Sequence, residues 1–269
     1  MKNAFSFLND SFLLRVQESS GVGFEDTGGE LEIYDFNMSG SKGGDNPVLL
    51  GSVKTESHFS SLAWSTGGSL ASKYSLGLIA GGMENGSVHV WDPKAIMEQR
   101  PAIVASFSQH SSGPVKAVQF NSLNPTQLAS GGSDGKVLIV DLTTPNNVMV
   151  PCESRQQTAQ ITSIAWNTQV AHVVASSSAD GTVAVWDLKS RKAWCELRGE
   201  TAGQAVSDIA WNPTQGLHLL TASQDDRNPF IKLWDLRSST SMPLATLQGH
   251  EGGILSVSWC PHDEHLLLS

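Results

Sequence analysis

The chain repeats one short motif: VHVWD at 88–92, VAVWD at 183–187 and IKLWD at 231–235, with VLIVD at 137–141 in the same pattern. Apolar residues alternate with others ahead of a closing aspartate, and alternation over a few residues is typical of a half-buried β-strand. The closing residues Asp92, Asp141, Asp187 and Asp235 follow one another at steps of 49, 46 and 48 residues. This regular period indicates an internal repeat built from strands.

Tryptophan marks a second register within the same repeat. Of 8 tryptophans in 269 residues, Trp91, Trp186 and Trp234 belong to the motif above. Four more close the short segments SLAW, SIAW, DIAW and SVSW, at Trp64, Trp166, Trp211 and Trp259, and Phe120 takes that slot in AVQF. A slot that recurs once per repeat is a packing position, so these rings are predicted to fill the layers between sheets. Trp194 lies outside both registers and is expected at an exposed edge, with or without a partner.

Each period contains four strand-like segments. Between the two tryptophan registers lies a segment with small residues, such as TQLASGG at 126–132. A tight turn such as Asp134-Gly135 or Asp180-Gly181 follows, and Asp-Gly favours a two-residue hairpin loop. A fourth apolar segment, such as AWCELR at 193–198, comes after the closing aspartate. Four strands joined by short turns are one blade of a β-propeller, so the sequence predicts an all-β propeller.

The count of periods predicts an incomplete propeller with four whole blades and a partial blade at each end. Whole periods cover roughly 48–92, 103–141, 148–187 and 193–235. A fifth period stops at Ser269, and its closing motif would fall at about position 280. The segment at 29–36 fits an earlier blade, whereas residues 1–23 match no register. We therefore assign 24–269 to the propeller, leave 1–23 unmatched, and expect a fragment, an isoform or an incomplete gene model.

The closing Trp-Asp pairs, the small-residue strands and Gly249-His250 resemble the WD-repeat proteins. In that family a histidine before the first strand and a Ser or Thr on the second strand form a hydrogen-bonded set with the turn aspartate and the tryptophan. The resemblance implies structural roles for several residues. They are Trp91, Asp92, His110, Asp134, Asp141, Asp180, Trp186, Asp187, Trp234, Asp235 and His250. This hydrogen-bonded set is incomplete in several repeats, because the repeat with Asp180 lacks an obvious histidine and Val140 replaces the tryptophan in another repeat.

Longer strings are more specific than the repeat. They include GLIAGGMENGSVHVWDPKAI at 77–96, ITSIAWNTQVAHVVASSSADGTVAVWDLK at 161–189 and HEGGILSVSWCPHDEHLLLS at 250–269. These strings resemble the N-terminal propeller of the large outer-coat subunit of the COPII vesicle coat, the Sec31 family. The resemblance implies a non-enzymatic scaffold in endoplasmic reticulum to Golgi vesicle transport. It places the chain in the cytoplasm, at endoplasmic-reticulum exit sites and on vesicles, peripheral to the membrane.

The same resemblance implies protein partners: the smaller outer-coat WD-repeat subunit, the inner coat, and further copies of the chain at coat vertices. The insertion Gln224, Asp225, Asp226 and Arg227 departs from generic repeats, and it is either a surface loop without a role or a contact in the coat lattice. A different WD-repeat adaptor, in a chromatin or ubiquitin-ligase complex, is the alternative function.

Composition and motifs argue against several classes of function. A net charge of −9 argues against a nucleic-acid partner, because a phosphate-backbone reader needs a clustered basic face. No catalytic motif or phosphate-binding loop is found, so we expect neither an enzyme nor a cofactor. His262-Asp263-Glu264-His265 has metal-binding residue types, but no helix aligns the two imidazoles, and no metal site is predicted.

Overall fold

The computed structural model describes residues 5–8, 12–18, 28–35, 47–65, 72–144, 147–198 and 203–269. The chain divides into two compact units, residues 1–115 and 116–269. Short antiparallel strands dominate both units, and the described residues contain a single helix, α1 (Pro93–Met97). The all-β class predicted from the alternating segments is therefore confirmed.

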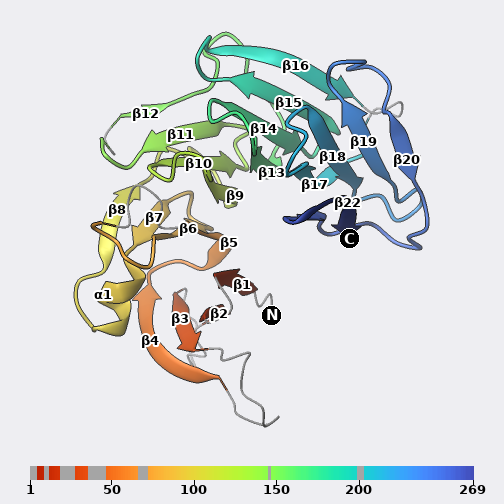
Figure 1. The fold of residues 1–269 in the computed structure, drawn as a ribbon. Helices are drawn as coiled ribbons and strands as arrows, with labels where there is room; N and C mark the ends of the chain where they lie inside the picture. Colours follow the sequence, from red (N-terminus) through yellow and green to blue (C-terminus); the bar gives the residue numbers. More distant parts are fainter. Residues whose placement is uncertain are drawn as a thin grey trace. The chain divides into compact units, whose positions relative to one another are not determined.

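The first unit contains two four-stranded sheets, each with its strands in chain order (Figure 1). The first sheet comprises β1 (Phe5–Leu8), β2 (Phe12–Glu18), β3 (Gly29–Asp35) and β4 (Val48–Thr55). The second comprises β5 (Phe59–Trp64), β6 (Ile79–Met83), β7 (Val88–Trp91) and β8 (Ile103–Phe107). Leu14, Ile33, Ile79 and Trp91 belong to one buried cluster, so the two sheets share a core.

The second unit continues the same architecture with three four-stranded sheets and one two-stranded sheet. Their strands are β9 (Val115–Phe120), β10 (Gln127–Gly132), β11 (Val137–Asp141), β12 (Val148–Met149); β13 (Ile161–Trp166), β14 (Val173–Ser178), β15 (Thr182–Asp187), β16 (Lys192–Arg198); β17 (Val206–Trp211), β18 (His218–Ser223), β19 (Ile231–Asp235), β20 (Ala245–Leu247); and β21 (Ser258–Cys260) with β22 (Asp263–Leu268). Apolar clusters between successive sheets bury one layer against the next.

The first sheet differs from the partial blade that the sequence predicted. Strands β1 and β2, within the segment that matches no register, pair with β3 and so complete four strands. Strand β2 alternates as a strand should, since Leu14 and Val16 are buried while Arg15 reaches the surface side. It carries neither a tryptophan nor a small-residue ending, which is why the repeat pattern did not include it.

The sequence period and the sheets are out of phase by one strand. The period that begins near residue 48 opens with β4, yet β4 pairs with β3 of the preceding sheet. In the same way β16, which opens the period at 193–235, pairs with β15. Each sequence repeat therefore supplies the outermost strand of one sheet and the first three strands of the next.

The hairpin turns follow the predicted chemistry. Gly86, Gly135 and Gly181 have φ values of 85°, 76° and 87°, a region that side-chain-bearing residues rarely adopt. A Cβ at Gly181 would also lie 2.5 Å from the Gln204 carbonyl oxygen. These glycines are thus required both for the turn and for the close approach of a neighbouring segment.

Candidate functional site

Three tryptophans of the SIAW-type register, Trp166, Trp211 and Trp259, join neighbouring sheets. The indole Nε1 of Trp166 donates to the Gln119 carbonyl oxygen at 3.0 Å. Trp211 Nε1 donates to Ala165 at 3.0 Å, and Trp259 Nε1 reaches Ala210 at 3.3 Å. In each case the acceptor lies on the first strand of the preceding sheet. These three rings fill the layers, as predicted, and each also makes one hydrogen bond to the preceding sheet, whereas Trp64 Nε1 donates forward to the Leu76 carbonyl oxygen at 2.8 Å.

A buried asparagine directly after this aromatic slot makes the matching bond forward. Asn121 Nδ2 donates to Ala171, Asn167 Nδ2 to Gly216 and Asn212 Nδ2 to Glu264, with distances of 2.8, 2.6 and 3.0 Å to the carbonyl oxygens. Their Oδ1 atoms accept backbone N–H groups two and three residues ahead. These asparagines were not predicted from the sequence, although FN at 120–121 and WN at 166–167 and 211–212 recur at the same position of each repeat.

Asp208 on β17 connects three consecutive sheets. Its Oδ1 accepts Ser163 Oγ at 2.7 Å, and its Oδ2 accepts Ser256 Oγ at 2.7 Å and Val257 N at 2.9 Å. Ser163 lies on β13, and Ser256 precedes β21. One carboxylate therefore links the first strand of its own sheet to the sheets on both sides, beside a cavity of about 370 Å³ lined by these strands.

The tryptophans of the Trp-Asp register bond within their own sheets. Trp186 Nε1 donates to Ser176 Oγ at 2.8 Å, and Ser176 Oγ donates to Gln157 Oε1 at 2.5 Å. Gln157 thus takes the place that the family gives to a histidine, in the repeat where no histidine was found. In the next sheet Trp234 Nε1 donates to Thr221 Oγ1 at 3.0 Å.

The corresponding slot in the second sheet is built differently. Gly81 replaces the hydroxyl-bearing residue, and the buried Trp91 Nε1 has no hydrogen-bond partner. A Cβ at Gly81 would lie 2.7 Å from the Phe59 ring, so that ring occupies the space. His89 stacks on Trp91 with ring centroids 5.6 Å apart, and burial lowers the pKa of His89 although Glu56 opposes this shift.

The closing aspartates terminate their strands by capping the turn that follows. Asp92 Oδ1 accepts Lys94 N and begins α1, and Asp141 Oδ1 accepts Thr143 N and Oγ1. Asp187 accepts Ser190 Oγ and Lys189 N, and the serine hydroxyl is the main cause of its lowered pKa. The Arg237 side chain is the main cause of the lowered pKa of Asp235. Each of these carboxylates therefore accepts hydrogen bonds from the turn that follows its strand and stabilises that turn.

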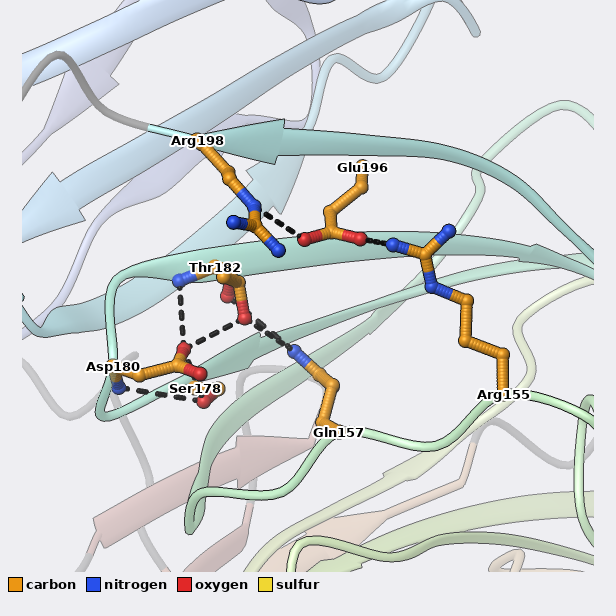
Figure 2. Close-up of polar contacts among 7 residues, drawn as sticks. All are labelled: Arg155, Gln157, Ser178, Asp180, Thr182, Glu196 and Arg198. Carbon is orange, nitrogen blue, oxygen red and sulfur yellow. Dashed lines mark hydrogen bonds and ion pairs between the residues drawn. The ribbon is translucent and has the colours of Figure 1, made fainter. Parts of the chain in front are cut away.

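The turn aspartates are held in the same way. Asp134 Oδ1 accepts Lys136 N at 3.1 Å. Asp180 Oδ1 accepts Ser178 Oγ, Thr182 N and Thr182 Oγ1 (Figure 2). Burial alone raises the pKa of Asp180, but these hydrogen bonds outweigh it and the net shift is downward.

The two histidines of the expected set lie in different environments. His110 is buried, whereas His250 is exposed and its Nε2 lies 2.8 Å from Ser269 Oγ. His262 and His265 flank Asp263 and Glu264 in the sequence, and Glu264 Oε2 accepts a hydrogen bond from Thr214 Oγ1. Among the residues that the structure describes, no group of three His, Cys, Asp or Glu side chains is placed to hold a metal ion.

The 224–227 insertion contacts the segment that leads into β21. Asp225 Oδ1 accepts Arg227 N at 2.9 Å, and its Oδ2 accepts Gln204 Nε2 at 3.1 Å. Asp226 Oδ1 accepts Gly253 N at 2.8 Å. Gln224 O lies so close to Gly253 that a Cβ there would approach to 2.3 Å. The insertion therefore has a structural role, because it holds the segment that leads into β21, while the side chains of Gln224, Asp226 and Arg227 stay exposed.

Some of the exposed apolar side chains lie on the outermost strands of their sheets. Val48 and Leu49 lie on β4, Ile103 on β8, Trp194 on β16 and Leu247 on β20. Trp194 is 47% exposed, as expected for the tryptophan outside both registers. In the described part of the chain, no helix is long and apolar enough to cross a membrane.

Four-stranded meanders closed by Trp-Asp strands, with backward tryptophan bonds between sheets, define a WD-repeat β-propeller domain. The family described as "Nucleolar protein 10-like, N-terminal domain" matches residues 52–232, and the chain belongs to this family of β-propellers. The WD domain, G-beta repeat, matches residues 241–269.

Among curated proteins, the chain is homologous to the SEC31 protein transport proteins, which confirms the resemblance drawn from the sequence strings. It is 36% identical to the protein of Dictyostelium discoideum over 256 residues and 40% identical to that of Chaetomium globosum over 243 residues. These alignments cover 91% and 89% of the chain. The chain spans 18% of the length of these relatives.

Solved structures agree with this assignment. One described as "COPII on membranes, outer coat vertex" superimposes with a TM-score of 0.80 at 32% identity, covering 98% of this chain and 68% of the other. A chain of the mitotic checkpoint complex superimposes with a TM-score of 0.69 at 18% identity, over 96% and 69% of the two chains. The second likeness shows the propeller fold alone.

Proposed function

We propose that this chain acts as a non-enzymatic scaffold in the outer coat of COPII vesicles, through protein contacts of its propeller domain. The observation that carries the proposal is the superposition on the outer-coat vertex structure over 98% of the chain. The identity of 36–40% to SEC31 proteins over about nine-tenths of the chain supports the same role.

The carboxylates also favour a scaffold over a catalyst. Asp92, Asp141, Asp187 and Asp235 each accept backbone N–H groups of their own turns, and Asp208 is used between sheets. A general acid or base needs a carboxylate that can reach a substrate proton. We therefore propose that the domain has no catalytic role.

The proposed partners are the smaller outer-coat WD-repeat subunit, the inner coat and further copies of this chain at coat vertices. The proposed location is the cytoplasmic surface of endoplasmic-reticulum exit sites and COPII vesicles, peripheral to the bilayer. Exposed apolar side chains on the outermost strands, such as Ile103 and Trp194, offer contact area for such partners.

The experiment is affinity purification of the endogenous tagged chain after mild crosslinking, combined with imaging against a marker of exit sites. Recovery of COPII outer-coat subunits and colocalisation at exit sites are expected. Recovery of ubiquitin-ligase or chromatin subunits without coat proteins would contradict the proposal.

A nucleolar role is the second candidate, because the matching family is named after nucleolar protein 10. The same imaging distinguishes the two roles, since a nucleolar scaffold would concentrate in the nucleolus and would co-purify with nucleolar proteins.

A further inference from the structure

A polar pocket opens on the sheet formed by β13–β16, at the end that carries the Asp180 turn (Figure 2). Its volume is about 220 Å³. Arg155, from the segment before β13, and Arg198, at the end of β16, approach Glu196 from opposite sides. The indole of Trp186 and the methyl of Ala184 contribute an apolar part of the lining.

The carboxylate of Glu196, at the centre of the pocket, already has two arginine partners. Glu196 Oε1 accepts Arg198 Nε at 2.6 Å, and Glu196 Oε2 contacts a terminal nitrogen of Arg155. The Glu196 side chain is 16% exposed, whereas those of Arg155 and Arg198 are 54% and 72% exposed. Burial thus holds the carboxylate in place, and both guanidinium groups extend past it into solvent.

The second carboxylate of the pocket, that of Asp180, also has hydrogen-bond partners. Asp180 accepts three hydrogen bonds from Ser178 and Thr182. The two cations and two anions balance in charge, but not in hydrogen-bonding capacity. A guanidinium has five N–H donors, and one contact to Glu196 leaves most of them available to a ligand.

A third donor is oriented by the buried relay. Gln157 Oε1 is held by Ser176 Oγ, which in turn accepts the Trp186 indole N–H. This fixes the amide so that Nε2 points toward Thr182, where its contacts are long, at 3.4 Å to both the carbonyl and the hydroxyl oxygen. A ligand acceptor at this point would form a shorter bond than either contact supplies.

From this surplus of fixed donors, we propose that the Arg155–Glu196–Arg198 pocket binds the carboxylate of an acidic peptide segment from a protein partner. The carboxylate would take paired N–H donors from the two guanidinium groups, a geometry for which arginine is suited. Because Glu196 and Asp180 balance the two arginines in charge, recognition rests on local hydrogen bonds.

The test measures binding of a fluorescein-labelled hexaglutamate peptide to the whole 269-residue chain by fluorescence anisotropy, with a hexaglutamine peptide as the neutral probe. Arg155→Gln and Arg198→Gln should each weaken hexaglutamate binding at least about tenfold, since a charge-assisted pair is lost. Arg237→Gln is the matched control, because Arg237 is an exposed arginine paired with Asp235 outside the pocket. It should leave binding unchanged.

Glu196→Gln separates a binding pocket from a purely structural ion pair. Removing the internal carboxylate frees both arginines, so hexaglutamate should bind several-fold more tightly than to the wild type. A structural ion pair predicts only a lower melting temperature for Glu196→Gln, with no gain in binding. Circular dichroism melting of every variant identifies any that fail to fold, and Arg198→Gln, which alters the more exposed of the two arginines, is the least disruptive.

Two results would overturn the proposal. One is equal binding of hexaglutamate to the wild type and to both arginine variants, or no binding at all. The other is arginine-dependent binding to phosphatidylserine vesicles without binding to the peptide, which would assign the pocket to a lipid surface. Neither result bears on the coat assignment, because the assay contains no coat protein.

Discussion

The indole nitrogen of Trp211 donates to the carbonyl oxygen of Ala165 at 3.0 Å, and this bond joins the first strands of two successive sheets. Asn167, two residues beyond that acceptor, donates in the other direction to Gly216 at 2.6 Å. The same pair of bonds recurs at the interfaces before and after this one. Each interface in residues 116–269 is therefore held by one tryptophan bond and one asparagine bond of opposite direction.

Asp208→Asn should destabilise the second unit by about 1.5–3 kcal/mol, because a charge-assisted contact to Ser163 or Ser256 is lost. Chemical denaturation of the purified chain measures this change. Asp263→Asn is the control, since Asp263 is exposed and caps only His265 N. Equal effects of the two substitutions would show that Asp208 does not link the sheets.

Ser176→Ala should cost about 1–3 kcal/mol, because the buried Trp186 N–H loses its acceptor and Gln157 loses its donor. The reverse change, Gly81→Ser, should not rescue the unpaired Trp91 N–H. A Cβ at Gly81 clashes with Phe59 at 2.7 Å, so this variant should be less stable than the wild type. Thermal melting monitored by tryptophan fluorescence tests both, and a stabilised Gly81→Ser would refute the packing argument.

Acidification should weaken the domain through the closing aspartates. The pKa values of Asp187 and Asp235 lie below their ordinary value of 3.8, mainly because of Ser190 and Arg237 respectively. A lowered folded-state pKa gives stability that is present above the unfolded value and is lost as pH falls through the folded value. The double variant Asp187→Asn, Asp235→Asn should therefore lose less stability than the wild type as pH falls below 3.8. Parallel pH profiles would contradict this expectation.

Trp194→Ser should reduce incorporation of the chain into COPII coats reconstituted on liposomes, without lowering its melting temperature. Trp194 is 47% exposed on an outermost strand, so its removal costs little folding energy but takes away a large apolar contact. Flotation of coated liposomes measures incorporation. Trp166→Ser, by contrast, should unfold the domain, because that ring is buried between sheets. Full incorporation of Trp194→Ser would show that this tryptophan makes no coat contact.

The sequence predicted the repeat, the strand order within it and the packing role of the tryptophans, because each of these leaves a periodic trace. Trp186 and Trp234 occupy equivalent places in successive sheets, as their spacing indicated. Strands β1 and β2 were not predicted, since they pair by alternation alone and carry none of the repeat's marker residues. The fourth strand of a blade was predicted after the closing aspartate, and β16 pairs with β15 accordingly, although the period bounds such as 193–235 begin at that strand.

The polar contacts between segments were harder to predict, because periodicity does not specify which segments meet in the fold. Asn167 reads as a turn residue in sequence, and only the packed sheets show that it reaches Gly216. Gln157 precedes Ile161 by four residues, as His250 precedes Ile254, and that spacing is a signal by which it could have been found. Arg155 and Glu196 are separated by about 40 residues and follow no repeat, so the pocket they form arises only from the fold.

The opposite directions of the tryptophan and asparagine bonds affect how the successive sheets unfold locally. An internal sheet such as β13–β16 is tied on both flanks, whereas the β21–β22 sheet is tied only to β17–β20 within this unit. Stability in such a one-dimensional array is a sum of nearest-neighbour couplings. Within this unit, sheets bonded on both flanks are then expected to open last, with the slowest amide hydrogen exchange in the central strands β14 and β15.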